Sequence, residues 1–334
     1  MIETRNLSKS YGPKRAVDDL TCTVLPGKVT GFLGPNGAGK STTMRMIVGL
    51  DHPTSGTVIV NGRRYADHPA PLQEVGALLD AKAAHPGRSA RTHLRIMAVT
   101  EGISTRRVDE VIELAGLESV ADKRVGSFSL GMAQRLGIAA ALLGDPATLI
   151  LDEPVNGLDP EGVTWVRNLV KYLAGQGRTV FLSSHLMSEM SQTADHLIVL
   201  GQGKLIADSP IEDIIARASG VTTRVRSAQA DAIVAHFAGP GIRATSNEPG
   251  LVTFDGISAE QIGDAAAAQG WVLHELTPVT SSLEQAYMEL TEGTQEFSSG
   301  MFDVPAADRP MAYGASDPSA VSPAAPVDIS GGAR

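Results

Sequence analysis

The apolar positions of residues 1–220 follow two alternating patterns, one typical of buried strands and the other of helices. Short apolar runs such as 148–151 have the length of a strand, whereas 160–173 repeats its apolar residues every three or four positions, as a helix does. This alternation favours an α/β domain in which helices flank a buried sheet. The expected strands are 2–7, 20–24, 28–33, 57–60, 148–151, 179–182, 196–200 and 204–208, and the expected helices are 40–48, 91–99, 106–115, 130–143, 160–173 and 187–194.

One long stretch departs from this alternation. Residues 81–143 contain three of the expected helices and few strand candidates. We therefore predict an α-helical subdomain inserted into the α/β domain of residues 1–220.

Residues 221–293 carry shorter elements in a different order. The pattern predicts β-α-β-β-α-β, the split βαβ arrangement of a small α+β, ferredoxin-like domain. This domain shows no catalytic constellation, and we expect a packing or dimer-stabilising role for it. Pro, Ala, Ser, Gly and Asp dominate residues 294–334, which predicts a disordered tail. A helix expected at 210–219 leads out of the first domain. Beyond it, the expected strands are 222–226, 241–245, 251–255 and 271–276, and the expected helices are 228–237, 258–269 and a closing helix at 281–290.

The composition narrows the class of protein. The 334 residues are 43% hydrophobic, which is enough for a sizeable core. No apolar run approaches the roughly 18 residues that a membrane helix needs. The single cysteine, Cys22, excludes an internal disulfide and fits a reducing compartment.

The net charge of −9 is unevenly distributed. Residues 1–100 carry 13 Lys and Arg against 7 Asp and Glu, whereas residues 251–334 carry 2 against 12. Because a generic nucleic-acid-binding surface is basic, we expect no nucleic-acid partner.

A glycine-rich segment between an expected strand and an expected helix carries the clearest chemical signal. Residues 34–41 read GPNGAGKS and fit the pattern G-x-x-x-x-G-K-[ST]. The glycines let backbone amides approach phosphate oxygens, and the following helix directs its positive end to the same point. Lys40 is expected to reach the β- and γ-phosphates, and the Ser41 hydroxyl is expected to bind Mg²⁺.

Two carboxylates follow the apolar strand 148–151. At such a strand end Asp152 can hold Mg²⁺, directly or through water. Glu153 can polarise an attacking water molecule. Many strands end in an acidic turn, but the position downstream of the phosphate loop favours the functional interpretation.

A second loop with serine and glycine, residues 127–132, precedes the helix expected at 130–143. Ser129 is placed to cap that helix, and capping alone is the plainer interpretation. The same residues at a helix N-terminus can also form an anion site.

Together these segments resemble the nucleotide-binding subunit of ABC transporters, over residues 1–220. The loop at Lys40 matches the Walker A motif, Phe128–Met132 lies where the family has its LSGGQ signature, and Asp152 and Glu153 match Walker B and the catalytic glutamate. The resemblance implies a P-loop NTPase fold, ATP hydrolysis, and ATP and Mg²⁺ as ligands. The ATP site that it implies consists of Tyr11, Gly34, Pro35, Asn36, Gly37, Ala38, Gly39, Lys40, Ser41 and Thr42.

Three residues acquire a role only through the resemblance. Tyr11 matches the aromatic residue that stacks on adenine, Asp159 belongs to the D-loop, and His185 matches the switch histidine. The family role of that histidine is catalytic, through contact with the γ-phosphate. Without the resemblance, Tyr11 and His185 would be interpreted as packing or structural residues.

The chain departs from the family pattern at two places. Leu130 replaces a glycine and Met132 a glutamine of the signature, whereas Ser129 and Gly131 remain. The glutamine of the Q-loop is represented by Asp80, which is also a candidate Mg²⁺ ligand. Both variants, and residues 276–290, look like those of the drug- and antibiotic-exporting subgroup that includes daunorubicin- and bacitracin-resistance ATPases.

The resemblance also implies partners and a location. ATPases of this subgroup pair with a separate ABC-2-type permease, so the chain is expected at the cytoplasmic face of the membrane. Two cassettes dock head to tail, and the signature residues of one subunit close over the γ-phosphate bound by the other. The signature residues concerned are Ser129, Leu130, Gly131 and Met132. The implied function is ATP-driven efflux of a drug, antibiotic or lipid-like substrate.

Two other functions remain open from the sequence. A soluble ABC ATPase that acts on ribosomes or DNA is one alternative, although the chain has one Walker A motif and no sustained heptads. The ATPase of an importer is the other, and its C-terminal domain would bind a regulator.

Overall fold

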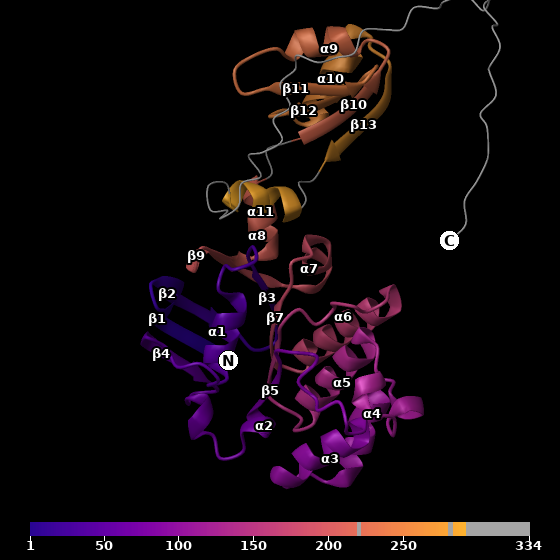
Figure 1. The fold of residues 1–334 in the computed structure, drawn as a ribbon. Coiled ribbons are helices and arrows are strands. Elements are labelled where there is room, and N and C mark those ends of the chain that lie inside the picture. Colours follow the sequence, from indigo (N-terminus) through magenta and orange to yellow (C-terminus); the bar gives the residue numbers. More distant parts are fainter. Residues whose placement is uncertain (219–221, 280–282, 292–334) are drawn as a thin grey trace, which may run out of the picture. The chain divides into compact units, whose positions relative to one another are not determined.

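The computed structural model describes residues 1–218, 222–279 and 283–291, which form three sheets with their helices (Figure 1). The disordered tail predicted for 294–334 lies outside the described residues. No helix within the described ranges is long and apolar enough to cross a bilayer.

A six-stranded sheet forms the centre of residues 1–218, which we call the cassette. Its strands are ordered β5-β6-β7-β3-β8-β9, and all neighbours are parallel except β8 and β9. The carboxyl ends of β3, β6 and β7 therefore meet at one edge of the sheet. The strands are β3 (Val29–Leu33), β5 (Val75–Leu78), β6 (Thr148–Leu151), β7 (Thr179–Ser183), β8 (His196–Gly201) and β9 (Lys204–Pro210).

Apolar cores cover both faces of this sheet. Ile150 and Phe181 belong to one core, whereas their neighbours Leu151 and Leu182 belong to the other. Successive side chains of a strand point to opposite faces, so a strand buried on both faces is apolar at every position. This explains the short continuous apolar runs of the sequence.

The first strands form a sheet of their own, which the sequence pattern did not separate from the central sheet. The antiparallel order is β2-β1-β4, with β1 (Ile2–Tyr11), β2 (Lys14–Val24) and β4 (Ser55–Val60). The prediction of one buried sheet was therefore wrong for these strands. A tight turn joins β1 directly to β2, and such a hairpin must be antiparallel, whereas the central strands are joined by crossovers.

Strand β5 was absent from the predicted elements. It is four residues long and contains Gly76, which lowers its apparent strand propensity. The glycine is required by packing, because a Cβ at residue 76 would lie 1.9 Å from the carbonyl oxygen of Ala141.

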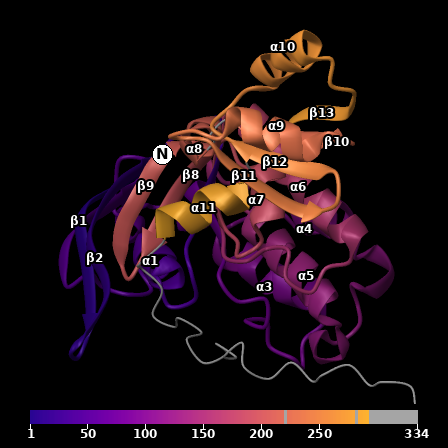
Figure 2. The same cartoon turned by 90° about the horizontal axis from the view of Figure 1, so that it is seen from above.

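The helices of the cassette flank the central sheet. Three of them, α3 to α5, fall within residues 81–143, as the pattern predicts. In both views they lie on the opposite side of the cassette from the β2-β1-β4 sheet (Figures 1 and 2). The α-helices are α1 (Lys40–Ile47), α2 (Pro71–Glu74), α3 (Ala90–Thr100), α4 (Thr105–Leu114), α5 (Leu130–Leu142), α6 (Pro160–Gly175), α7 (Met187–Thr193) and α8 (Ile211–Ala218). Short 3-10 segments occur at Tyr65–Asp67, Glu118–Val120 and Val125–Ser127.

Four of these helices begin at a side-chain cap. Ser89, Ser104, Ser129 and Asp159 each accept a hydrogen bond from a backbone amide in the first turn of α3, α4, α5 and α6. Such caps satisfy amides that have no partner within the helix and typically contribute about 1 kcal/mol each. The caps fix where each of these helices begins.

Residues 222–279, which we call the C-terminal module, form a four-stranded antiparallel sheet with two helices. The strand order is β11-β12-β10-β13, and the chain order is β-α-β-β-α-β. Phe254, Ile233 and Ile262 are fully buried in its core. Its elements are β10 (Thr222–Ser227), α9 (Ala230–Phe237), β11 (Arg243–Glu248), β12 (Leu251–Asp255), α10 (Ala259–Gln269) and β13 (Leu273–Val279).

The last described helix, α11 (Leu283–Thr291), packs against α8 rather than against the four-stranded sheet. Its buried residues Ala286 and Tyr287 belong to the same core as Ile211 and Ile214 of α8. The segment predicted as the end of the second domain therefore contributes its apolar face to the cassette.

Candidate active site

The phosphate loop connects β3 to α1. Gly39 precedes α1 with φ +103°, a conformation that favours glycine, and a Cβ there would lie 2.4 Å from the carbonyl oxygen of Ala16. Gly37 also has a positive φ, of +84°. Because only glycine adopts this turn without strain, the loop can present its backbone amides to an anion at the N-terminus of α1.

Lys40 is the buried cation of this loop, with only 7% of its surface exposed. Its Nζ donates hydrogen bonds to the carbonyl oxygens of Gly34 (2.6 Å) and Pro35 (3.3 Å). Burial lowers the pKa of Lys40, and the negative charges of Glu153 and Asp152 partly oppose that shift. A cation held in this way is poised to exchange carbonyl partners for phosphate oxygens.

The two carboxylates follow directly after β6, and Ser183 at the end of β7 connects them. The Ser183 hydroxyl donates to Asp152 Oδ1 (2.5 Å) and accepts a hydrogen bond from the backbone amide of Glu153 (2.9 Å). Glu153 has φ +50°, in the left-handed region that costs a non-glycine residue roughly 1–2 kcal/mol. Strain of this kind persists only where surrounding contacts hold it.

His185 lies beside Glu153. Its Nδ1 is 2.7 Å from Glu153 Oε2, within hydrogen-bond distance. Parallel pairing of β6 with β7 produces this contact, because residues that follow the two strands leave the sheet at the same edge. The sequence predicts that the strand ending at 182 delivers His185 beside the phosphates; the structure places its ring beside Glu153.

The signature segment and the D-loop contact each other. Ser129 caps α5 by accepting from the amide of Met132 (3.2 Å), and Asp159 caps α6 by accepting from the amide of Gly162 (2.9 Å). Gly157 has φ +74°, and a Cβ on it would lie 2.4 Å from Leu130 Cδ2. Leu130, one of the two residues that depart from the family signature, therefore packs against the segment matched to the D-loop.

Tyr11 and Asp80 approach the loop from two further segments. The Tyr11 hydroxyl donates to Asp51 Oδ2 (3.0 Å), and the ammonium of Lys9 lies 5.0 Å from the centre of its ring. The ring itself remains half exposed and accessible for stacking. Asp80 is exposed, and its Oδ1 accepts from the amide of Lys82 (2.8 Å).

One cleft of about 620 Å³ brings many of these residues together. Twelve of the predicted site residues line it: Tyr11, Asn36, Gly37, Ala38, Gly39, Lys40, Ser41, Thr42, Asp80, Leu130, Asp152 and Glu153. The other predicted residues, all within the described part of the chain, lie outside the lining: Gly34, Pro35, Ser129, Gly131, Met132, Asp159 and His185.

Sequence reasoning missed several residues of the cleft. Lys14, Ala16, Gln134 and Asn156 line it, and no role was predicted for them. Gln134 lies two residues beyond the segment that matches the signature. The described residues contain no group of three or more His, Cys, Asp or Glu that could hold a metal.

Family models match two parts of the chain. The ABC transporter model matches residues 17–156. A model described as a domain of unknown function (DUF8746) matches residues 221–284.

Relatives extend over most of the chain. The bacitracin transport ATP-binding protein BcrA of Bacillus licheniformis is 43% identical over 217 residues, which cover 64% of this chain and 71% of the relative. The uncharacterized ABC transporter ATP-binding protein YdbJ of Bacillus subtilis (strain 168) is 32% identical over 302 residues, 89% of this chain and 97% of the relative. A solved structure, described as that of an ATP binding subunit of an ABC transporter, has a TM-score of 0.60 and 30% identity and covers 65% of this chain and 92% of its own.

Proposed function

We propose an export function on the premise that this chain belongs to the ABC transporter family, among its ATP-binding proteins. The chain binds and hydrolyses ATP, the activity of that family. We infer that hydrolysis energises efflux of an antibiotic, drug or lipid-like substrate through a separate permease of the ABC-2 type. The similarity to a bacitracin transport protein supports the antibiotic class.

One observation carries the hydrolytic part of this proposal. The phosphate loop, the buried Lys40 and the carboxylates of Asp152 and Glu153 line one cleft, and His185 lies 2.7 Å from Glu153. This arrangement provides phosphate binding, charge neutralisation and proton acceptance at one edge of a rigid sheet.

We assign phosphate binding to the loop amides of residues 34–39 and to Lys40. Tyr11 would stack on the adenine through its exposed ring face. Ser41 and Asp152 line the same cleft and are hard oxygen donors, so they fit Mg²⁺ together with phosphate oxygens and water. Bound Mg²⁺ would neutralise charge on the phosphates. Asp80, at the rim, is proposed as a weaker candidate for the same ion.

We assign the general base to Glu153, which would orient the attacking water and accept its proton. His185 would contact the γ-phosphate and keep the Glu153 carboxylate in place through their short contact. Since charge builds up on the transferred group, a positioned histidine stabilises the transition state more than the ground state.

We propose that two copies dock head to tail to complete the site. Ser129 is exposed at the N-terminus of α5, and Gly131 follows it, so this end of the helix is available to a partner subunit's phosphate. Gly157, two residues before Asp159, packs against Leu130, so this loop would follow any movement of the signature. The permease would hold this pair at the cytoplasmic face of the membrane.

We propose residues 1–220 as the ATPase domain, with the helical subdomain at 81–143, and 221–293 as the accessory domain, whose last described helix, α11, packs on α8 of the ATPase domain. The strand order of the C-terminal module and its β-α-β-β-α-β chain order support a ferredoxin-like name for that domain.

Head-to-tail docking is tested by mixing two inactive variants, Ser129→Arg and Lys40→Ala. Each variant alone disables both sites of a dimer. A mixed dimer contains one site with an intact Lys40 and an intact Ser129, so mixing should restore ATP turnover. A mixture as inactive as its components would contradict head-to-tail docking.

Export is tested in the source strain. Deleting the gene should increase sensitivity to at least one compound in a panel of bacitracin-like peptides, lantibiotics and anthracyclines. The wild-type chain should restore resistance, whereas an equally abundant Glu153→Gln variant should not. Unchanged sensitivity to the whole panel would contradict the antibiotic class.

A further inference from the structure

The backbone of Glu153 is held from both sides. Its amide donates to the Ser183 hydroxyl (2.9 Å), and its carbonyl oxygen accepts a hydrogen bond from Gln134 Nε2 (3.0 Å). Glu153 occupies the left-handed region at φ +50°, so contacts are needed to keep it there. The two hydrogen bonds provide them, one from β7 and the other from α5.

Gln134 is suited to this role by its chemistry. Only 3% of its surface is exposed, and it lies in the second turn of α5. A neutral amide can donate to a carbonyl in such surroundings, whereas a buried lysine or arginine would add the cost of desolvating a charge. Apolar residues of similar size could fill the space but could not hold the carbonyl.

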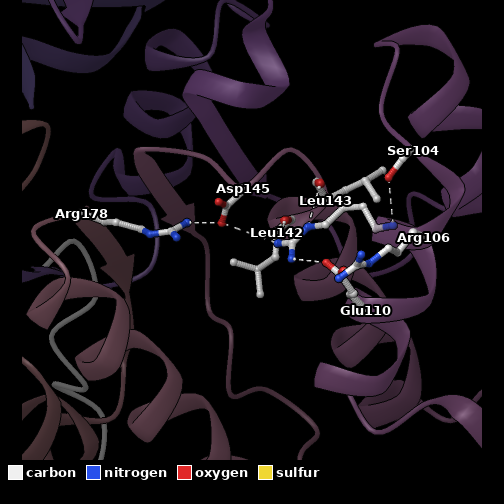
Figure 3. Close-up of polar contacts among 8 residues, drawn as sticks. Ser104, Arg106, Glu110, Leu142, Leu143, Asp145 and Arg178 are labelled. Atoms are coloured by element: carbon white, nitrogen blue, oxygen red, sulfur yellow. Dashed lines mark hydrogen bonds and ion pairs between the residues drawn. The ribbon is translucent and has the colours of Figure 1, made fainter.

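The helix that carries Gln134 is anchored at its far end. Arg107 donates to the carbonyl oxygens of Leu142 (2.8 Å) and Leu143 (3.3 Å). Arg178 pairs with Asp145 just beyond them (2.7 Å), as Figure 3 shows. A cation at the last carbonyls of a helix satisfies groups that lack partners within the helix. The position of Gln134 is therefore set by a fixed helix rather than by a mobile loop.

We propose that Gln134 is a positioning residue, which holds the Glu153 backbone in its left-handed conformation and thereby aims the carboxylate at water. The inference rests on the proposed function of Glu153 as general base. It also gives the signature helix a second role, because α5 presents Ser129 at its first turn and fixes Glu153 of the same subunit through its second.

The test compares three variants of the full chain in steady-state ATP hydrolysis. Gln134→Met keeps the length and volume of the side chain and removes the amide donor. Losing a donor to a buried carbonyl should lower kcat about tenfold, whereas ATP binding, which depends on the phosphate loop, should keep KM within about twofold. Gln134→Asn retains the amide but shortens the side chain by one methylene, and it should show the same loss of kcat with nearly unchanged KM.

Gln176→Met, at the exposed end of α6, is the matched control and should retain wild-type rates.

A merely structural role predicts a different result. Loss of packing would lower the unfolding midpoint and weaken ATP binding along with kcat, and that pattern would overturn the inference. Wild-type kcat in both Gln134 variants would also overturn it, while leaving the general base untouched. Full turnover by Glu153→Gln would instead remove the proposed base, and both proposals would fall together.

Discussion

The two larger sheets of this protein differ in burial, in strand direction and in where the ends of their strands lie. In the cassette, β3, β6 and β7 are buried at every position and run parallel. Their carboxyl ends meet, and Lys40 and Asp152, which follow β3 and β6, gather there with Ser183, the last residue of β7. In the C-terminal module, burial alternates along β10 and β12, and neighbouring strands run in opposite directions.

This difference explains where the chemistry lies. A parallel sheet covered on both faces leaves its carboxyl edge as the place where loops and polar groups converge. An antiparallel sheet places successive loops at opposite ends, so polar groups are dispersed. Within residues 222–279, which the structure describes, no metal-binding group of His, Cys, Asp or Glu occurs. Paired substitutions in the two regions can therefore separate a catalytic cassette from a module for which we expect a packing or dimer-stabilising role.

The largest difference in kcat is expected between alanine substitutions of two histidines. His185→Ala should lower kcat roughly 100-fold, because it removes the group that contacts Glu153 and that we propose contacts the γ-phosphate. His236→Ala is the matched control in the C-terminal module, where the ring packs edge-on against Trp271 at 5.2 Å. Steady-state ATP hydrolysis by the full chain measures both. Equal losses of kcat in the two variants would contradict the proposal that the cassette, and not the C-terminal module, carries out hydrolysis.

Substitutions of two buried phenylalanines test the same comparison through the free energy of unfolding. Phe181 packs against Phe32 in the cassette with tilted rings (4.8 Å between ring centroids), and Phe254 lies in the core of the C-terminal module. Either residue changed to alanine should cost about 3–5 kcal/mol of unfolding free energy in its own region. Phe181→Ala should lower both the unfolding midpoint and ATP turnover, whereas Phe254→Ala should spare turnover at temperatures below its own transition. Loss of turnover in folded Phe254→Ala would show that the module is needed for hydrolysis.

The smallest effect concerns Cys22 in the N-terminal sheet. Burial raises the pKa of its thiol to about 11, although a hydrogen bond with Thr4 opposes this shift. The folded protein therefore keeps the proton at pH values where the unfolded chain, with a thiol pKa of about 8.5, has released it. The resulting stabilisation is complete below about pH 8.5 and is lost as the pH rises through about 11.

Alkylation of the thiol measures this shift without a mutant, because Cys22 is the single cysteine of the chain. Iodoacetamide at about pH 9 should label the native protein far more slowly than the protein in denaturant. Equal labelling rates would show that the strand carrying Cys22 opens readily.

Local patterns predicted much of the fold and of the site. An apolar run in the sequence indicates a buried strand such as β6, and the spacing of the glycines indicates the loop before α1. Both features could be predicted because they depend on residues that are neighbours in the sequence. The family assignment made from these motifs is confirmed by the relatives, and so is the P-loop fold.

Features that depend on distant segments could not be predicted in the same way. The separate β2-β1-β4 sheet depends on pairing between β1 and β4, and β5 depends on the fit of Gly76 under Ala141. The hydrogen bond from Gln134 to Glu153 joins α5 to the loop after β6, and no local pattern in the sequence predicts it. Sequence patterns identify which residue types are present, whereas contacts of this kind exist only after folding.

Turnover and nucleotide binding by Glu153→Gln test the central claim most directly. The amide keeps the shape of the side chain and cannot accept the proton of water, so hydrolysis should fall by roughly 10²–10⁴-fold while ATP remains bound. With head-to-tail docking, ATP should then accumulate a stable dimer, visible by size-exclusion chromatography with light scattering. Near-normal hydrolysis by this variant would contradict the account, because the cleft would then contain a different base.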